Sequence, residues 1–471
     1  MNQLFKNRYL IILILLIGLF LRVRLSQDKC VHKWDERYHA LVAKNLLKHP
    51  LKPTLYETSL FAYDYKQWYA NHLWLHKQPL PLWLIAASYA VFSSGDLQTR
   101  IPSILLSLLA IYVTYLLGKN LFNDKVGLLS AFFMSINGLV IEMVAGRVAT
   151  DHYDILYMVF TEISILFALI SAQKNKIFYA FLSGIFIGLA ILTKWLPCLV
   201  IIPVHVCFLL NSERSVKTII KQISSSLLSA ALVSIPWQIF IVMHYPTEAL
   251  WSYHYNWLHT IQILDGQGGN FFYYINKIRI NYSEIIYLPL IYFGFLYTKL
   301  KFKNRIHLAI LIWIFVPILF FSLIQTKMQG YILFVSPALF IVTSKFFFDL
   351  KDKLIKTTNR KWLKYVCVLI CVLVIILPIR YCLERTSFGF GESNCENYIE
   401  NYRSFQGKLS EKCVVLNVKE PIEFMFYNDC IAYSIKSISQ EEFKRIGSLG
   451  FTIFTIDDSN TTLIRLNSLG Y

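Results

Sequence analysis

The chain has 471 residues, of which 56% are hydrophobic and only 16% are charged, with a formal net charge of +17. This composition excludes a disordered chain, a collagen-like fibre and a small disulfide scaffold, because apolar residues exceed and charged residues fall short of the soluble norm. It is typical of a polytopic membrane protein. The basic excess does not indicate a nucleic-acid partner, because Lys and Arg lie in short runs between apolar stretches.

Apolar stretches occur along most of the chain. A membrane span needs about 20 mostly apolar residues. We therefore expect about 11 crossings, at residues 9–22, 101–118, 126–143, 152–171, 177–193, 195–210, 218–243, 286–300, 306–324, 331–348 and 362–380. The first reads as an uncleaved anchor, since no small-residue cleavage site follows it. Stretch 80–93 is apolar but short, and it reads as a helix that dips into the membrane without crossing it.

Basic turns assign the two sides of the membrane. Cytoplasmic loops are enriched in Lys and Arg, which places residues 174–176, 214–221, 299–305 and 351–364 inside the cell. The outward parts are then loops 25–79 and 246–285, the turns around 147–151 and 327, and the tail from 381. We expect residues 1–380 to form a transmembrane domain in the inner (plasma) membrane.

The tail, residues 381–471, has more acidic than basic residues and reads as a small soluble α/β domain on the periplasmic face. Residues 413–418 and 451–457 read as strands, and 441–450 as a short helix that ends at glycine. In loop 25–79, the spacing of apolar residues predicts an amphipathic juxtamembrane helix that begins at Asp35.

Nine cysteines divide into two groups on this topology. Cys198, Cys207, Cys367 and Cys371 lie within apolar spans and read as packing residues. Five face outward: Cys30, Cys382, Cys395, Cys413 and Cys430. Disulfides persist outside the cytoplasm, so two pairs within the tail are compatible with the sequence, although free thiols are an equal alternative and connectivity cannot be read.

Ionisable residues gather on the predicted outward face, where buried or clustered charges indicate function. They are Asp35, Glu36, Arg37, His76, Lys77, Arg147, Asp151, His259 and Lys327. Most have a structural alternative: the acids could cap helices, Arg147 could pair with Asp151, and the others could be interfacial. Lys327 is harder to explain in this way, because turns on the outward side of a membrane usually contain few Lys residues.

Carboxylates beside several cations suit one chemistry, the transfer of a sugar from a lipid phosphate. The leaving phosphate departs as an anion and needs cations, while the incoming hydroxyl needs a carboxylate base. Nearby carboxylates also stabilise the oxocarbenium-like transition state of glycosyl transfer.

A series of motifs carries a family resemblance. WDERYHALVAKNLL, HKQPLPLWL, GRVATDHYDI, GLAILTKWLP and TKMQGYILFVSPAL occur in this order. Their order resembles that of the polyprenyl-phosphate-dependent transferases of the GT-C fold, above all the aminoarabinose transferases and mannosyltransferase-like proteins. The resemblance covers residues 1–350 and implies a GT-C membrane fold.

The resemblance also implies roles for individual residues. Asp35 resembles the family's first-loop aspartate, a base or metal contact, and Lys77 resembles the lysine that meets the lipid phosphate. Asp151 resembles the second acid, and His259 and Lys327 resemble a later outward histidine and lysine. The chain departs from the family at Asp-Glu-Arg-Tyr, which is one residue short, and at Gln78, which separates Lys77 from proline. His76 stands where Glu is common.

We predict a membrane glycosyltransferase that moves a sugar from a polyprenyl-phosphate donor to an acceptor, namely lipid A, another glycan or a protein, by inverting displacement. Asp35 is the expected base and Asp151 assists it. The expected phosphate-binding residues are Lys77, Arg147, His259 and Lys327, with Glu36, Arg37 and His76 in supporting positions. A divalent metal is not demanded, but Asp35, His76 and Asp151 are its candidate ligands.

Two other classes of protein remain as alternatives. A transporter or lipid flippase would place ionisable groups at mid-membrane in broken spans and show two similar halves, neither of which is visible here. A sensor would use the tail as its ligand module and would not need Asp35.

Overall fold

The computed structural model describes residues 2–149, 151–356, 361–386, 395–410, 412–457, 459 and 461–466. The chain divides into two compact units, Met1–Gln27 with Ser103–Gly391 and Asp28–Pro102 with Glu392–Tyr471. This division differs from the predicted one at 380/381, because the loop after the first helix belongs to the same unit as the tail.

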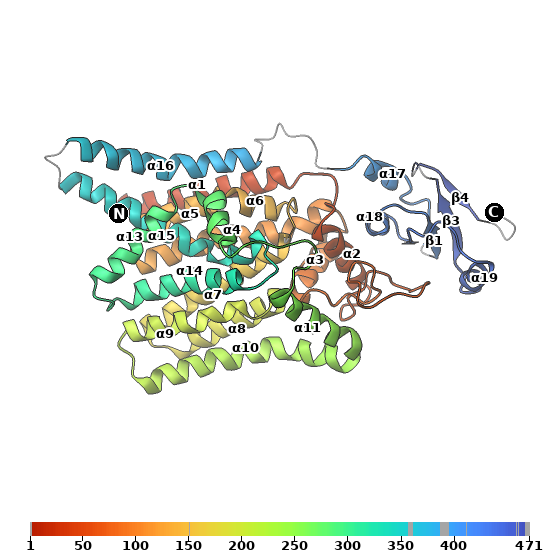
Figure 1. Ribbon diagram of the computed structural model, residues 1–471, viewed down its shortest axis with the longest axis horizontal. Helices are drawn as coiled ribbons and strands as arrows, with labels where there is room; N and C mark the ends of the chain where they lie inside the picture. The colour runs from red at the N-terminus through yellow and green to blue at the C-terminus, as the bar shows by residue number, and fades with distance from the viewer. Residues whose placement is uncertain are drawn as a thin grey trace. The chain divides into compact units, whose positions relative to one another are not determined.

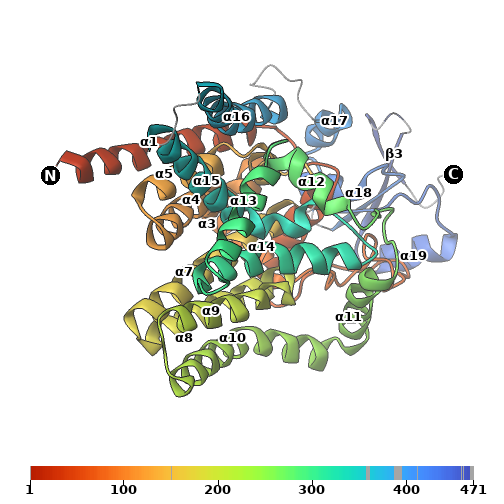
Figure 2. The ribbon, with the colours of Figure 1, turned by 60° about the vertical axis from the view of Figure 1, so that its left-hand side comes forward.

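The elements named in the described part of the first unit are all helices (Figures 1 and 2). Its helices are α1 (Asn2–Leu25), α4 (Asp96–Leu121, from Ser103 on), α5 (Asp124–Ser135), α6 (Gly138–Val144), α7 (Asp151–Lys174), α8 (Ile177–Lys194), η1 (Leu196–Val200), α9 (Ile201–Asn211), α10 (Val216–His244), α11 (Pro246–Ile261), α12 (Tyr273–Tyr282), α13 (Tyr287–Lys299), α14 (Arg305–Leu323), η2 (Gln329–Val335), α15 (Ser336–Lys356) and α16 (Lys361–Thr386).

Seven stretches among the described residues are long and apolar enough to cross a membrane, and they lie on α4, α7, α8, α10, α14, α15 and α16. Helices α5 and α6, bent by 52°, make an eighth if they form one span. All coincide with predicted spans, so the protein is a multi-pass membrane protein. The predicted spans 9–22, 195–210 and 286–300 are also helical, and the count of about 11 crossings stays a prediction.

Asparagine side chains set the bend between α5 and α6. Asn123 caps α5 by accepting a hydrogen bond from the backbone N–H of Val126, and Asn137 caps α6 in the same way from Val140. Such caps satisfy donors that a helix start leaves unpaired, so a new helix begins at Asn137 in place of a continued one.

Helices α7, α8 and α10 pack side by side in both ribbon views. Small residues allow α8 and α10 to approach closely. A Cβ atom at Gly184 would overlap the carbonyl oxygen of Ser226 and the hydroxyl of Ser229. The two serine hydroxyls also donate hydrogen bonds across to backbone carbonyls of α8. Close backbone approach and interhelical hydrogen bonds are the forces that join helices inside a membrane.

The second unit combines the outward loop with the tail. Its helices are α2 (Asp35–Leu46), α3 (Pro79–Phe92), α17 (Tyr398–Ser404), α18 (Pro421–Tyr427) and α19 (Gln440–Ser448), and its strands are β1 (Cys413–Leu416), β2 (Ile431–Ala432), β3 (Thr452–Ile456) and β4 (Leu463–Arg465). The helix predicted to begin at Asp35 is confirmed, as are the two strands and the short helix of the tail. Helix α3 has 14 residues, or about 21 Å, too short for a full crossing.

The strands form one mixed sheet in the order β2-β1-β3-β4. The central strand β1 is parallel to both neighbours, and β4 is antiparallel to β3. All four residues of β1 are buried, as expected of a strand covered on both faces.

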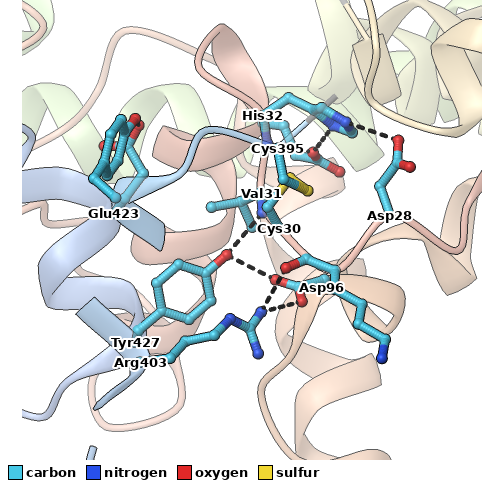
Figure 3. Close-up of a disulfide and its surroundings, with 12 residues drawn as sticks. Asp28, Cys30, Val31, His32, Asp96, Cys395, Arg403, Glu423 and Tyr427 are labelled. Carbon is cyan, nitrogen blue, oxygen red and sulfur yellow. Dashed lines mark hydrogen bonds and ion pairs between the residues drawn. A yellow bond between two sulfur atoms is a disulfide. The ribbon is translucent and has the colours of Figure 1, made fainter. Parts of the chain in front are cut away.

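A disulfide joins Cys30 to Cys395, 365 residues apart (Figure 3). The bond links the two chain segments that make up the second unit. Beside it, the hydroxyl of Tyr427 accepts from the backbone N–H of Val31 and donates to Asp96. The expectation of two pairs within the tail is therefore wrong in its pairing.

Cys382 is predicted to belong to the outward tail, but it lies in helix α16, and its side of the membrane stays a prediction. Helix α16 continues to Thr386, so Cys382 is buried against Leu25, Ile136 and Ile141 of the first unit. Cys382 is a free thiol.

Candidate functional site

The predicted base and the first predicted phosphate-binding cation lie together in the second unit. Asp35 begins α2, and Lys77 lies just before α3. The Nζ atom of Lys77 is 3.9 Å from Oδ2 of Asp35, and both side chains remain partly exposed, at 27% and 17%. The N-cap of α2 is Trp34, which makes no side-chain cap, and Asp35 is an acid of the first helical turn. The arrangement leaves a carboxylate and an ammonium on one accessible face.

His76, next to Lys77, belongs to an aromatic cluster. Its ring stacks on Trp68 with a centroid distance of 4.6 Å and lies edge-on to Trp74 at 5.8 Å. Trp68 in turn contacts Tyr38 of α2. These contacts hold the backbone at His76, and hence the base of the Lys77 side chain, against α2.

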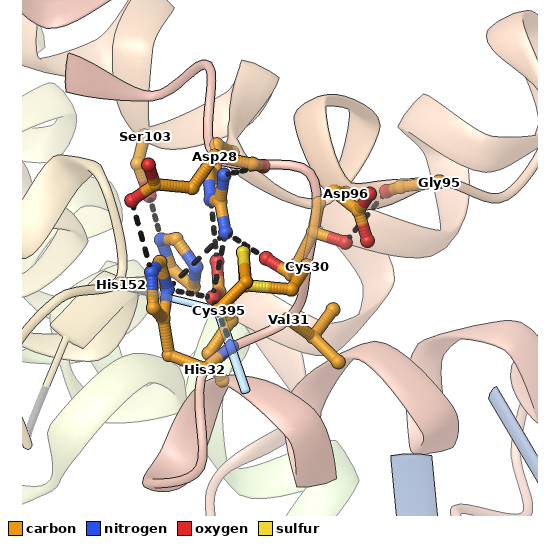
Figure 4. Close-up of polar contacts among 12 residues, drawn as sticks. Asp28, Cys30, Val31, His32, Gly95, Asp96, Ser103, His152 and Cys395 are labelled. Atoms are coloured by element: carbon orange, nitrogen blue, oxygen red, sulfur yellow. Dashed lines mark hydrogen bonds and ion pairs between the residues drawn. A yellow bond between two sulfur atoms is a disulfide. The ribbon is translucent and has the colours of Figure 1, made fainter. Parts of the chain in front are cut away.

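Glu36 follows Asp35 but is fully buried in a polar network, of which Figure 4 labels Asp28, Cys30 and His32. Its two carboxylate oxygens accept hydrogen bonds from Arg100 at 2.7 and 2.9 Å. One of them also accepts from the backbone N–H of His32 at 2.8 Å. Arg100 further donates to the carbonyls of Asp28 and Cys30, so the network fixes the loop that leads to Asp35.

The imidazole of His32 also belongs to this network. Burial opposes the charged form, but the carboxylates of Glu36 and Asp28 outweigh it and raise the pKa of His32. Both acids lie within 3.1 Å of the imidazole nitrogens. The imidazole of His32 and the guanidinium of Arg100 thus contact the buried carboxylate of Glu36 from the loop before α2 and from α4.

Arg37 contacts the tail. Its guanidinium donates to Glu420 at 2.7 Å and to Glu423 at 2.8 Å, at the start of α18. Glu423 is fully buried, and burial raises its pKa to about 7 even though Arg37 opposes the shift. Arg37 therefore joins α2 to α18, a role that the sequence did not reveal.

The first unit places the remaining predicted residues near the ends of its helices. Arg147 is half-buried in the turn after α6, where its backbone N–H donates to the carbonyl of Glu142. The preceding Gly146 has a φ of 70°, in the left-handed region that favours glycine. Asp151 is the first residue of α7, and its side chain lies outside the described residues.

A buried ion pair that the sequence did not single out lies one helical turn further on. Asp154 is 1% exposed and pairs with Lys194 at the end of α8. The Lys194 ammonium also lies 4.6 Å from the ring centroid of Tyr331 in η2. Lys194 follows an apolar span on the predicted outward side, so the signal that identified Lys327 could have identified it as well.

His259 and Lys327 lie on segments that are tied together. The backbone N–H of Thr326 donates to the carbonyl of His259, and that of Lys327 donates to Gln267. The His259 ring donates to the carbonyl of Tyr255 at 2.9 Å. These bonds attach the end of α11 and the following loop to the segment before η2.

Lys327 is a buried cation, with 3% of its surface exposed. Its ammonium donates to the carbonyl of Ile324, and among the described residues no acidic side chain pairs with it. Burial lowers its pKa. A buried ammonium held by a neutral carbonyl retains most of its attraction for an anion.

The described side chains do not assemble a metal site. Within the described ranges, no three His, Cys, Asp or Glu residues lie close enough to hold an ion. Of the candidate ligands, Asp35 is near Lys77 and His76 stacks on Trp68, while the Asp151 side chain is not described. We therefore derive no chemical step through a metal.

Comparison with known proteins connects this arrangement to a family. The family model described as dolichyl-phosphate-mannose-protein mannosyltransferase matches residues 76–237. An uncharacterised protein of Aquifex aeolicus (strain VF5) is 26% identical over 339 residues, which are 71% of this chain and 63% of that protein. An undecaprenyl phosphate-alpha-4-amino-4-deoxy-L-arabinose arabinosyl transferase of Pseudomonas fluorescens (strain Pf0-1) is 24% identical over 197 residues, covering 40% of this chain and 33% of the transferase. The chain thus spans less than two thirds of the length of either relative.

The fold matches a solved structure over nearly its whole length. ArnT from Cupriavidus metallidurans, crystallised with undecaprenyl phosphate, aligns with a TM-score of 0.64 and 15% identity over 95% of this chain and 93% of ArnT. None of these likenesses supports the transporter alternative. The chain has the GT-C fold, and parts of it are similar to glycosyltransferases that use a polyprenyl phosphate.

Proposed function

We propose that the protein is a membrane glycosyltransferase that moves a sugar from a polyprenyl-phosphate donor to an acceptor on the outer face of the membrane. The observation that carries the proposal is the partly exposed pair of Asp35 and Lys77, 3.9 Å apart. A carboxylate base and a phosphate-binding cation are the two groups that this reaction requires.

The pair suggests an inverting displacement. The acceptor hydroxyl attacks the anomeric carbon and gives its proton to a carboxylate oxygen of Asp35. The bond between that carbon and the phosphate oxygen breaks, and the phosphate leaves with the bonding electrons. Lys77 offsets the negative charge that develops on the phosphate, so the leaving group needs no proton.

The predicted cations of the first unit have the charge that a donor phosphate requires. Lys327 is buried without an acidic partner among the described residues, and we assign it to the donor phosphate together with Arg147 and His259. Asp151 begins α7, and we assign it to assist Asp35 or to orient the acceptor. Each assignment follows from charge and from position at a helix end.

The disulfide supports the proposed orientation. Cys30 and Cys395 are oxidised in the second unit, and disulfides persist in the periplasm and outside the cell. The basic turns alternate along the sequence with the turns predicted to face outward, as expected of cytoplasmic loops. We therefore place the second unit, with Asp35 and Lys77, outside the inner membrane.

Two single substitutions test the mechanism. Asp35→Asn removes the base and Lys77→Ala removes the cation, and each should lower sugar transfer by purified full-length protein at least about 100-fold. Asp64→Asn and Lys48→Ala, at exposed positions of the same unit, are matched controls and should retain activity. Full activity of both Asp35→Asn and Lys77→Ala would remove this mechanism.

A separate measurement would identify the sugar and its acceptor. Mass spectrometry of cell-envelope glycolipids and glycoproteins, with and without the gene, would reveal a missing sugar and its acceptor together. Lipid A, another glycan and a protein are the acceptors that the proposal allows.

A further inference from the structure

Two free cysteines lie side by side in the sheet of the second unit. Strand β1 begins at Cys413 and pairs in parallel with β2, where Val414 lies opposite Ile431. One residue earlier on each segment, Cys413 is opposite Cys430. Residues opposite each other point to the same face, and neighbouring strands are about 4.8 Å apart. That spacing falls within the Cα–Cα range of about 4.4–6.8 Å that a disulfide requires.

Both thiols are buried, with 0% of Cys413 and 8% of Cys430 exposed. A hydrogen bond to Cys413, together with burial, raises the pKa of Cys430 well above its usual value. A thiol with a high pKa is a poor nucleophile, because the thiolate is the reactive form. Oxidation of this pair would therefore take place while the sheet is forming and the thiols are still accessible.

The same unit already contains an oxidised pair, Cys30 and Cys395. A disulfide at that position means that the unit folds where thiols can be oxidised. Cys413 and Cys430 meet the same oxidants during folding, and the sheet register holds them opposite each other.

We propose that Cys413 and Cys430 form a second disulfide of this unit. The two thiols together lose two protons and two electrons as the Sγ–Sγ bond forms, and the disulfide of a thiol–disulfide oxidoreductase is reduced to a dithiol. The bond closes the connection that contains α18. That helix holds Arg37 of α2 through Glu423, so the bond braces the helix that begins at Asp35.

Differential alkylation of the full-length protein in its native membranes tests the bond. Free thiols are blocked with N-ethylmaleimide under denaturing conditions, the protein is reduced, and newly exposed thiols receive an isotopically heavy reagent before peptide mapping. With both bonds present, five of the nine cysteines take the first label. Without reduction, the peptides of Cys413 and Cys430 should be found linked to each other.

Two labelling outcomes would contradict the proposed disulfide. If Cys413 and Cys430 both carry the first label while Cys30 and Cys395 remain linked, seven cysteines are free and the proposal is wrong. A link from Cys413 or Cys430 to any other cysteine also overturns it. These outcomes do not depend on transferase activity, so they stand apart from the proposed function.

Variants give a second readout. Cys413→Ala, Cys430→Ala and the double variant should lower the Tm by the same amount, about 5 °C, because each removes the same bond. Cys207→Ala, which removes a buried cysteine of the first unit, is the control for loss of a thiol alone. Additive decreases would mean that two separate thiols, and not one bond, stabilise the sheet.

Discussion

Three consecutive charged residues, Asp35, Glu36 and Arg37, have three different surroundings. Successive residues of a helix point about 100° apart, so adjacent side chains cannot share a face. Asp35 meets Lys77, Glu36 is buried against Arg100, and Arg37 reaches α18. The start of the helix could be predicted from the apolar spacing. The partners of Glu36 and Arg37 could not be predicted. Arg100 lies 64 residues from Glu36 in the sequence, and Glu423 lies 386 residues from Arg37.

The buried carboxyl of Glu423 makes the second unit sensitive to pH. Its pKa is raised from 4.5 to about 7 by burial, so the folded state binds more protons than the unfolded state between these two values. Stability is then complete below about pH 4.5 and decreases as the pH rises to about 7, by an amount on the order of 3 kcal/mol. The Tm of the second-unit transition, measured from pH 5 to pH 8, should show this decrease.

Substitution identifies the group responsible. Glu423→Gln removes the titrating carboxyl, and the decrease in Tm with pH should become shallower. Glu420→Gln leaves Glu423 in contact with Arg37 and removes only a minor contribution to the raised Glu423 pKa, so it should retain most of the slope. Equal slopes in wild type and Glu423→Gln would assign the pH dependence to another group.

At the scale of elements, apolar periodicity and length were sufficient to locate most helices and two of the strands. They could not show that α5 and α6 form a bent pair, because the bend depends on a cap at Asn137 within an apolar stretch. They also did not reveal that Asp154 pairs with Lys194, since the two lie on different helices. The sequence pattern that indicates such a pair is an acidic residue near the end of one membrane helix and a basic residue directly after a later apolar span.

The close contact between α8 and α10 depends on Gly184, because glycine has no side chain. Gly184→Val would place methyl groups where the carbonyl of Ser226 and the hydroxyl of Ser229 now lie. Overpacking of this kind costs about 1–3 kcal/mol. We expect a lower Tm of the detergent-solubilised protein and less folded protein in the membrane.

Gly294→Val is the matched control, because a Cβ atom at Gly294 would have no heavy atom within 4 Å. It should leave the Tm almost unchanged. If both variants unfold at the wild-type temperature, close packing at Gly184 does not stabilise the helix pair.

At the scale of the whole molecule, the composition of the chain predicted a multi-pass membrane protein. The strand and helix patterns of the tail predicted a small α/β fold. The grouping of residues 28–102 with the tail was not predictable from local patterns. It rests on contacts between distant segments, such as Arg403 with Asp96 and Lys44 with the carbonyl of Phe426. Periodicity reports which face of an element is apolar, and it does not report which element covers that face.

The orientation in the membrane can be tested with introduced cysteines. We expect Lys66→Cys, in the outward loop, to react with a membrane-impermeant maleimide on intact cells. Lys217→Cys, in the first turn of α10 and within the basic run 214–221, should react only after the membrane is permeabilised, because positively charged segments stay in the cytoplasm. Mass spectrometry of the peptide that carries the new cysteine separates it from the native thiols. The reverse labelling pattern would contradict the proposed topology.

The disulfide between Cys30 and Cys395 has a consequence for biosynthesis. Cys30 follows the first helix of the chain, whereas Cys395 follows α16, the last helix of the first unit. With the proposed orientation, Cys395 reaches the oxidising compartment only after every intervening helix has entered the membrane. Cys30 must therefore stay unpaired, or pair only transiently, throughout translation. The bond can close only on a fully inserted chain, so its presence reports that insertion is complete.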